Sequence, residues 1–311
     1  MSEAAAGSPK TRQPRWSAIA QNPVAIKELR SRMRGRRAFV VLTSFLLVMS
    51  GLISLVYIAF ASSTGGYGPE QQLAGKFVFA AVLSMQVILV IFIGPAFTAG
   101  SISGEKERQT YDLLRTTLLS ASSFVLGKLI SALSYVMLLI VASIPLLSIA
   151  FLLGGISPIE LLVSQLLIIV SAVTFALYGM FCSTLMRSTL AASVVTFAGS
   201  LFFTVGLPIL VLLGVSLLGS TVFFASGVSS TAELVMAFGG LALAATNLPA
   251  TLIVSEIFLV QEDALFFVKT SVGGSSVWLF SPWPWYLLLY LLLALLFFWA
   301  CVRRIRKISE G

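Results

Sequence analysis

The fold is decided by the stretch 104–119, which reads GEKERQTYDLLRTTLL and is the only long charge-dense segment between two long apolar segments. On a helix, Tyr111, Leu114 and Leu118 form one apolar stripe, while most of the polar side chains lie around the other side. Amphipathic helices of this kind lie on a membrane surface or dock on a partner. We therefore expect a helix over 104–119 that joins two membrane-spanning helices and stays outside the hydrocarbon layer.

The composition of the 311-residue chain is that of an integral membrane protein. Hydrophobic residues make up 58% and charged residues 10%, and the mean hydropathy is +1.01, whereas about a quarter of the residues in soluble domains are charged. With roughly 20 apolar residues per span, the chain is long enough for about six to eight helical spans. The two cysteines, Cys182 and Cys301, lie in apolar runs and indicate neither a disulfide framework nor a metal site.

Six apolar stretches predict six transmembrane helices in a single membrane domain over residues 38–302. The expected spans lie at about 39–61, 77–100, 124–154, 160–185, 190–218 and 285–302. The connections between the third, fourth and fifth spans are short, which makes these helices antiparallel neighbours. Gly94-Pro95 predicts a kink or a broken end in the second span.

The region 232–260 is apolar and long enough to span the membrane, but its sequence argues against a crossing. Asn247-Leu248-Pro249 interrupts it in the middle, and Glu233 and Glu256 lie within it. We expect a hairpin of short helices or a re-entrant cap on the outer side, before the last span. The fold class predicted from the sequence is thus an all-α integral membrane protein with six transmembrane helices and an outer-side helical hairpin.

The distribution of charge predicts the orientation. Lys and Arg mark cytoplasmic loops, and both the amino-terminal segment 1–37 and the carboxy-terminal tail 303–311 are basic. Two cytoplasmic ends require an even number of spans, which agrees with six. All Lys and Arg residues except Lys76 and Lys269 then lie inside. The outer side then holds a group of acidic residues, namely Glu70, Glu160, Glu233, Glu256, Glu262 and Asp263. It also holds the aromatic residues that we expect at the headgroup layer, namely Trp278, Trp283, Trp285 and Tyr286.

The amino-terminal segment contains a second candidate amphipathic helix. Asn22-Pro23 is a typical helix start, and Ile26, Leu29 and Met33 then form an apolar stripe among basic residues. This pattern predicts a helix in the cytoplasmic membrane surface that contacts anionic lipids. A solvated basic tail is the alternative. No fold signature accompanies these charges to indicate nucleic-acid binding.

Residues that could perform chemistry are scarce. The chain has no histidine and no Gly-x-x-x-x-Gly-Lys-Ser/Thr phosphate loop, so it is not expected to bind a nucleotide or hydrolyse ATP. The spans also lack the acidic or histidine chain of a proton relay. Gln86 and Gln165 are the most polar deep residues, and we expect a structural hydrogen bond between helices there. A transporter that lacks both a phosphate loop and a proton relay must take its energy from a partner protein. Spans that are this apolar suit a lipidic or amphipathic cargo.

Several motifs occur in an order that resembles a known family. They are Asn22-Pro23 with Lys27-Glu28, then Glu105-Lys106-Glu107-Arg108-Gln109-Thr110, Leu113-Leu114, Thr116-Thr117 and Gly127-Lys128. In this order and spacing the chain resembles the permease subunits of type-2 ATP-binding cassette (ABC) exporters. Gln109 stands where that family commonly has Gly. The second half of the chain resembles the family in layout only.

The resemblance implies a role for each amphipathic helix. The helix over 104–119 would be a cytoplasmic coupling helix that docks on a separate ATPase subunit, with the contact residues Glu105, Lys106, Glu107, Arg108, Tyr111, Asp112, Leu114, Arg115 and Leu118. The amino-terminal helix would be an interfacial elbow that includes Asn22, Pro23, Lys27, Glu28 and Arg30. Both helices would lie on the cytoplasmic side.

The resemblance also implies an assembly. Two ABC ATPase subunits, which hold ATP and Mg, would join two permeases, the second being another copy or a paralogue, in the inner membrane of a prokaryote. This chain would be no enzyme and would bind no cofactor and no nucleic acid. The alternative function is a non-transporting membrane scaffold or immunity-type protein that acts by association. A channel would require a continuous polar stripe along a span, and none is present.

Overall fold

The computed structural model describes residues 36–64, 70–109, 120–225, 230–261, 264–272 and 275–310. The expected interfacial elbow lies outside the described residues, and with it Asn22, Pro23, Lys27, Glu28 and Arg30.

Six helices of the described chain are long and apolar enough to cross a membrane. They are α3 (Arg36–Thr64), α4 (Glu70–Ala99), α7 (Ala121–Leu153), α8 (Pro158–Leu185), the helix that starts with α9 (Thr189–Leu201), and α13 (Pro282–Glu310). The predicted fold class, an all-α membrane protein with six spans, is therefore confirmed. The helix α4 continues through Pro95 to Ala99, so the second span does not end at the Gly-Pro pair.

Serine side chains cap the helices where the predicted turns occur. Ser157 starts α8 with a capping box, in which its hydroxyl accepts from the amide of Glu160 and the Glu160 carboxylate accepts from the amide of Ser157. Gly154 and Gly155 precede this cap with φ values of 87° and 83°, a conformation that glycine adopts without steric cost. The short turn makes α7 and α8 antiparallel neighbours.

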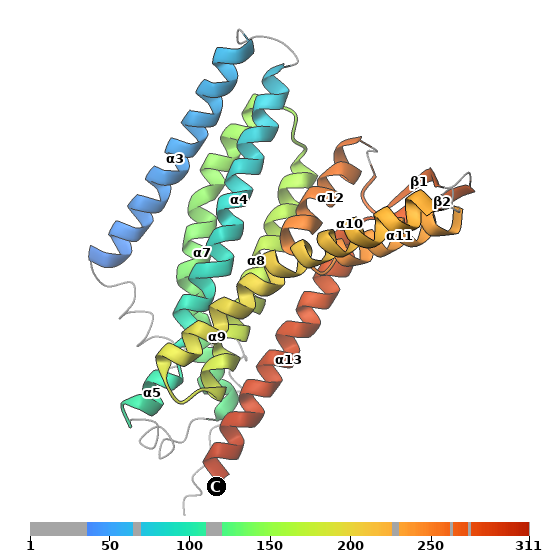
Figure 1. Cartoon of the computed structure of the whole chain (residues 1–311). Coiled ribbons are helices and arrows are strands. Elements are labelled where there is room, and N and C mark those ends of the chain that lie inside the picture. Colours follow the sequence, from blue (N-terminus) through green and yellow to red (C-terminus); the bar gives the residue numbers. More distant parts are fainter. Residues whose placement is uncertain are drawn as a thin grey trace, which may run out of the picture.

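The centre of the bundle is formed by α4 and α8, which pack along each other and carry the largest buried fractions among the spans. Figure 1 shows α7 beside them, α3 at one edge, and α13 descending to the C-terminus on the other side. The outer faces of the spans are apolar and exposed, for example at Leu152 of α7, Leu190 of α9 and Leu295 of α13. Such faces suit contact with lipid chains.

A polar cluster lies inside this apolar core. The side chain of Gln86 on α4 is fully buried, and its amide donates to Ser143 Oγ on α7. Gln165 Nε2 on α8 donates to Gln86 Oε1 at 3.0 Å, and Gln86 Nε2 donates back to Gln165 Oε1 at 3.3 Å. The expected hydrogen bond between helices is confirmed, and it joins three helices rather than two.

The fifth span contains a local change of helix type. Between α9 and α10 (Leu207–Ala225), residues Phe202–Gly206 form a π-helical turn. Its shifted hydrogen bonds leave carbonyl groups available, and Asn247 Nδ2 donates to the carbonyl oxygens of Phe203 and Thr204 at 3.1 and 2.9 Å. Asn247 Oδ1 also accepts from the amide of Ala250 at 3.2 Å. One amide thus connects the fifth span to the break in the region 232–260.

The region 232–260 forms two short helices, α11 (Ser230–Ala244) and α12 (Leu248–Gln261), with the break where the sequence predicted it. A two-stranded antiparallel sheet follows, formed by β1 (Phe267–Val272) and β2 (Ser275–Phe280), in which Phe267 pairs with Phe280. The sequence did not indicate this sheet. Figure 1 shows these elements together beside α10, far from the C-terminus.

The last helix differs from its prediction in two ways. It begins at Pro282 and continues to Glu310, so the expected tail after 302 is still helical. Tyr286 was expected among the aromatic residues of the headgroup layer, but it is fully buried, donates to or accepts from Ser171 Oγ at 2.6 Å, and stacks on Tyr290. The reason is that Tyr286 lies on the face of α13 that packs on α8. Trp278 and Trp285 are exposed as expected.

We predict that Gln86→Leu lowers the stability of the detergent-purified protein by about 1 kcal/mol or more, because Gln165 loses its amide partner in an apolar core. The double variant with Gln165→Leu should lose less than the sum of the two single variants, since no amide is then left unpaired. Thermal unfolding in detergent measures the stability of the single variants and of the double variant. Ser84→Ala is the control, because Ser84 is exposed on the same helix. Additive losses would show that the two amides do not support each other.

Candidate partner-docking site

The charged segment after α4 forms a short helix that ends early. Helix α5 comprises Ser103–Glu107, and Gln109 has a φ of 56°, a left-handed conformation that α-helices exclude. The expected helix over 104–119 is therefore interrupted at Gln109. Of the expected contact residues, Glu105, Lys106, Glu107 and Arg108 are described, and Tyr111, Asp112, Leu114, Arg115 and Leu118 lie outside the described residues.

The start of α5 is attached to the end of α8 by a buried serine. The hydroxyl oxygen of Ser183 accepts hydrogen bonds from the amides of Ile102 at 3.0 Å and Ser103 at 2.9 Å. Its own hydrogen is donated to Ser103 Oγ at 3.2 Å. All three residues are buried. These amides belong to the N-cap residue and the first residue of α5, where a helix offers no partner of its own. The hydroxyl oxygen of Ser183 is the acceptor that they need.

Lys106 binds the carboxyl end of α8. Its Nζ donates to the carbonyl oxygens of Thr184 at 2.7 Å and Met186 at 3.3 Å. The last carbonyl groups of a helix lack partners within the helix and carry a partial negative charge. A lysine ammonium group is well suited to this position because it supplies several donors and a positive charge.

Glu107 binds the start of α9 on the other side of the same turn. Its two carboxylate oxygens accept from the backbone amide of Thr189 at 2.8 Å and from Thr189 Oγ1 at 2.9 Å. The first amides of a helix carry a partial positive charge, which a carboxylate stabilises. Adjacent residues of opposite charge therefore bind adjacent helix ends of opposite partial charge.

Glu105 extends the attachment to a third helix. Its carboxylate forms an ion pair with Lys128 Nζ on α7, at a distance of 3.3 Å. The side chain of Lys128 is 4% exposed, and its ammonium group also lies 5.2 Å from the ring centre of Phe124. Residues 105 and 128 belong to two of the motifs noted in the sequence, and the structure shows that these motifs are in contact.

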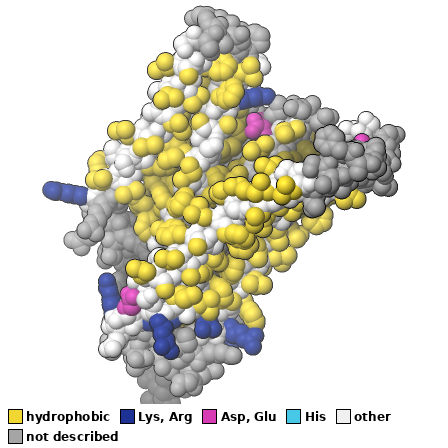
Figure 2. Space-filling model, viewed as in Figure 1, with side chains coloured by type: hydrophobic (Ala, Val, Ile, Leu, Met, Phe, Trp, Pro, Cys, Tyr) yellow, Lys and Arg dark blue, Asp and Glu magenta, His cyan; other side chains and the backbone are white. Residues whose placement is uncertain are grey.

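The segment 102–107 is thus attached to α7, α8 and α9 and follows directly from α4. Glu105, Lys106 and Glu107 were expected to contact an ATPase subunit, and their charged groups are engaged within the chain. The side chain of Arg108 is exposed. Whether any of these residues contacts an ATPase stays a prediction. Figure 2 shows Lys and Arg side chains gathered at this end of the molecule, where α13 also ends.

Sequence reasoning missed the residues that hold the segment. Ser183 and Thr189 lie about 80 positions further along the chain, and neither residue type is unusual at a turn between two spans. The sequence did contain one signal for the end of α5. Gln109 stands where the family commonly has Gly, and such a position often requires a positive φ.

Comparison with known protein families assigns a family to this chain. The family described as "ABC-2 family transporter protein" matches residues 22–236, which include the charged segment and the helices that hold it. No curated protein matches the chain.

We predict that Lys106→Met destabilises the protein by about 1–2 kcal/mol, because the end of α8 loses a cation and two hydrogen bonds. Arg108→Met is the matched control, and it should change the stability by less than about 0.5 kcal/mol because the side chain is exposed. The midpoint of thermal unfolding in detergent compares them. Equal effects of the two substitutions would contradict the described role of Lys106.

We also predict that Gln109→Gly raises the stability by about 0.5–1 kcal/mol, because glycine adopts the positive φ without steric cost. Gln109→Val should lower it, since a β-branched residue is strained in this conformation. The same unfolding measurement applies. A loss of stability with glycine would mean that the turn at 108–109 is not left-handed in the folded protein.

Proposed function

Since the chain belongs to the ABC-2 transporter family, we propose that it is the membrane-spanning permease of an ABC exporter driven by ATP hydrolysis in separate ATPase subunits. The family match confirms the resemblance to a type-2 ABC permease, and the six apolar helices make the chain a multi-pass membrane protein. The coupling of transport to ATP hydrolysis, the direction of transport and the nature of the cargo are parts of our proposal.

The observation that carries the proposal is the attachment of the segment 102–107. Polar contacts bind it to α7, α8 and α9, and it continues from α4 without a long linker. A partner that docks on this segment and moves as a rigid body would displace the ends of four spans together. Rigid-body motion transmitted through short, well-packed connections is a common route from a binding event to a conformational change.

The residues of the segment divide into two groups under this proposal. Glu105, Lys106 and Glu107 hold the segment on the bundle and transmit force, while exposed Arg108 contacts the ATPase. We propose that the stretch beyond it completes the contact, with apolar area and charges from Tyr111, Asp112, Leu114, Arg115 and Leu118.

We propose a working unit of two permeases and two ATPases, with ATP and Mg bound by the ATPases. The second permease is another copy or a paralogue. Both termini face the cytoplasm of a prokaryote, which the basic residues at the end of α13 and around α5 support (Figure 2). The elbow residues Asn22, Pro23, Lys27, Glu28 and Arg30 contact lipid headgroups.

A lipidic or amphipathic cargo agrees with the apolar character of the spans. The alternative of a scaffold or immunity-type protein requires no ATPase and no cargo. Family membership favours transport, since the family is one of transporters. The two functions differ in whether ATP hydrolysis depends on this chain.

We predict that Arg108→Glu weakens binding of the ATPase subunit by about tenfold or more, because a reversed charge meets the partner surface that arginine complements. The tagged chain is purified from native membranes, and the co-purifying protein with a phosphate loop is identified and reconstituted with it. Binding of the ATPase and the rate of ATP hydrolysis are then compared between the native permease and the Arg108→Glu variant. Arg108→Gln, which removes the charge without reversing it, should give an intermediate effect.

The thermal midpoint of the permease alone is the control, and Arg108→Glu should leave it unchanged. Unchanged ATPase binding and unchanged hydrolysis in a folded Arg108→Glu protein would exclude Arg108 from the contact. If no ATPase binds the native chain at all, the scaffold function gains support.

A further inference from the structure

A groove with a volume of about 550 Å³ lies between α10, α11 and α12. Binding sites for small molecules commonly have volumes of about 300–1,000 Å³, so the groove is large enough for a ligand. Aliphatic side chains from all three helices form its wall, among them Val211 of α10, Met236 of α11 and Val254 of α12. Figure 1 shows α10 and α11 together on the side of the bundle away from α3.

The wall offers no free polar group to a ligand. Among the described residues that line the groove, Asn247 is the one with a polar side chain. Its Nδ2 donates to the carbonyl oxygens of Phe203 and Thr204, and its Oδ1 accepts from the amide of Ala250. The hydrogen bonds of this amide are thus used within the protein. Ordered water needs two to four polar partners, so the groove suits hydrocarbon better than water.

Two adjacent glycines of α11 deepen the groove. Gly239 and Gly240 both line it, and a Cβ atom built on either glycine would have no described atom within 4 Å. Glycine weakens a helix relative to alanine, and close packing between helices does not explain these two glycines, since nothing described lies against them. They leave a recess in the wall that no described residue fills.

The mouth of the groove opens on the lipid-facing surface of the fifth span. Leu212 of α10 and Val235 of α11 line the groove and are 70% and 72% exposed. Their neighbours on α10, Leu210 and Leu213, are exposed as well. These leucines belong to a helix that is long and apolar enough to cross a membrane. The groove is therefore continuous with the surface that lipid chains contact, and a chain can enter it sideways without crossing water.

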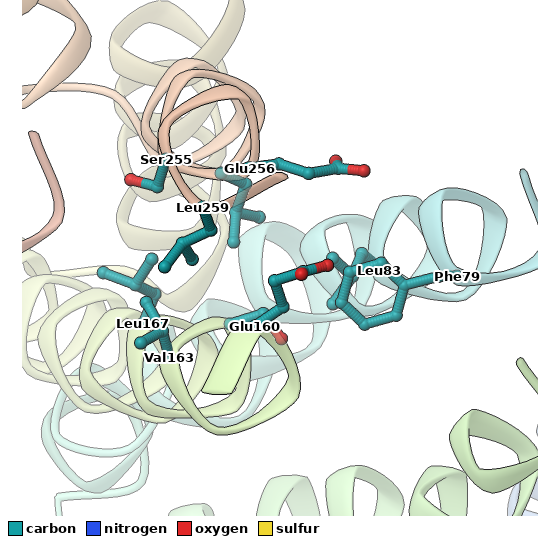
Figure 3. A pocket seen from close by; sticks show the side chains of 10 residues that line it. Phe79, Leu83, Glu160, Val163, Leu167, Ser255, Glu256 and Leu259 are labelled. Carbon is teal, nitrogen blue, oxygen red and sulfur yellow. The ribbon is translucent and has the colours of Figure 1, made fainter. Parts of the chain in front are cut away.

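The wall that α12 provides is held in place from behind. Ala250 and Val254 line the groove, while Leu259 lies on the opposite side of α12. There α12 packs toward α4 and α8 around a second cavity of only about 20 Å³. Figure 3 shows this small cavity, which Leu259 of α12 and Leu167 of α8 help to line. It has room for about one water molecule, so α12 lies close to the central helices and leaves the larger space on its other side.

We propose that the groove binds one acyl chain of a lipid from the surrounding bilayer. Lipid tails are as apolar as the wall, so the gain comes from van der Waals contact and from filling a space that neither water nor a described residue fills. A chain in the groove contacts α10 on one side and α11 and α12 on the other. It would thus connect the fifth span to the pair of short helices.

The inference goes beyond the proposed export function. Under that function the groove would hold the tail of a lipidic cargo, but binding of a lipid chain requires neither the ATPase nor transport. The two proposals can therefore fail separately, because ATPase binding is measured with Arg108→Glu and lipid binding is measured with the permease alone.

The experiment uses the purified full-length chain in phosphatidylcholine vesicles. A small share of the phosphatidylcholine carries a photoreactive diazirine near the end of one acyl chain. After illumination and digestion, mass spectrometry identifies the labelled residues. We expect label inside the groove, at Val211, Met236 and Val254, in addition to the exposed face of α13, for example at Leu295. Any surrounding lipid labels α13, which makes it the internal reference.

Gly240→Trp places a large side chain in the recess, so label at Val211, Met236 and Val254 should be lost while label on α13 is retained. Gly51→Trp is the matched control. Gly51 is an exposed glycine of α3 with the same open space around it and does not line the groove, so this variant should keep every label. Gly239→Trp repeats the test from the neighbouring position. The thermal midpoint verifies that each variant is folded.

The absence of label at Val211, Met236 and Val254 in the native chain would overturn the proposal. So would label that persists in both Gly240→Trp and Gly239→Trp, or that Gly51→Trp lowers equally. A second copy of the chain is the other candidate occupant. In that case the native groove would take no label, and Gly240→Trp would lower the molar mass that light scattering measures in detergent. That result would assign the groove to an interface between copies.

Discussion

The turn between α8 and α9 brings together two helix ends of opposite partial charge, and the segment after α4 matches both of them. Lys106 binds the carbonyl groups at the end of α8, and Glu107 binds the start of α9. A helix of five residues is too short to be stable alone. The position of this segment is therefore set by the helix ends that it binds, with buried Ser183 as the central contact.

Helix α8 is the element through which most polar contacts of the bundle pass. It hydrogen-bonds α4 through Gln165, and it hydrogen-bonds α13 through Ser171 and Thr174. Between these contacts the packing is apolar and tolerates small sliding movements, whereas hydrogen bonds in a bilayer fix particular pairs of residues. A displacement applied at the end of α8 would consequently reach α4 and α13 at defined points.

Local composition was sufficient to predict the spans, the antiparallel connections and the break at Asn247, because each depends on residues close together in the sequence. The partners of Glu105, Lys106 and Glu107 were not predictable, since they lie 23 to 82 positions away. The burial of Tyr286 depends on which face of α13 packs on α8, and aromatic composition alone does not specify that. The β1–β2 sheet was missed because the alternation in 267–280 is short and lies beside stronger helical signals.

The π-helical turn at Phe202–Gly206 changes how the fifth span should be mapped. Such a turn contains about one residue more than an α-helical turn, and one residue corresponds to a rotation of about 100°. A single helical wheel drawn through 189–225 would therefore assign the residues of α10 to the wrong side. Substitution or cross-linking scans along this span have to be read as two separate helical surfaces, one before Phe202 and one after Gly206.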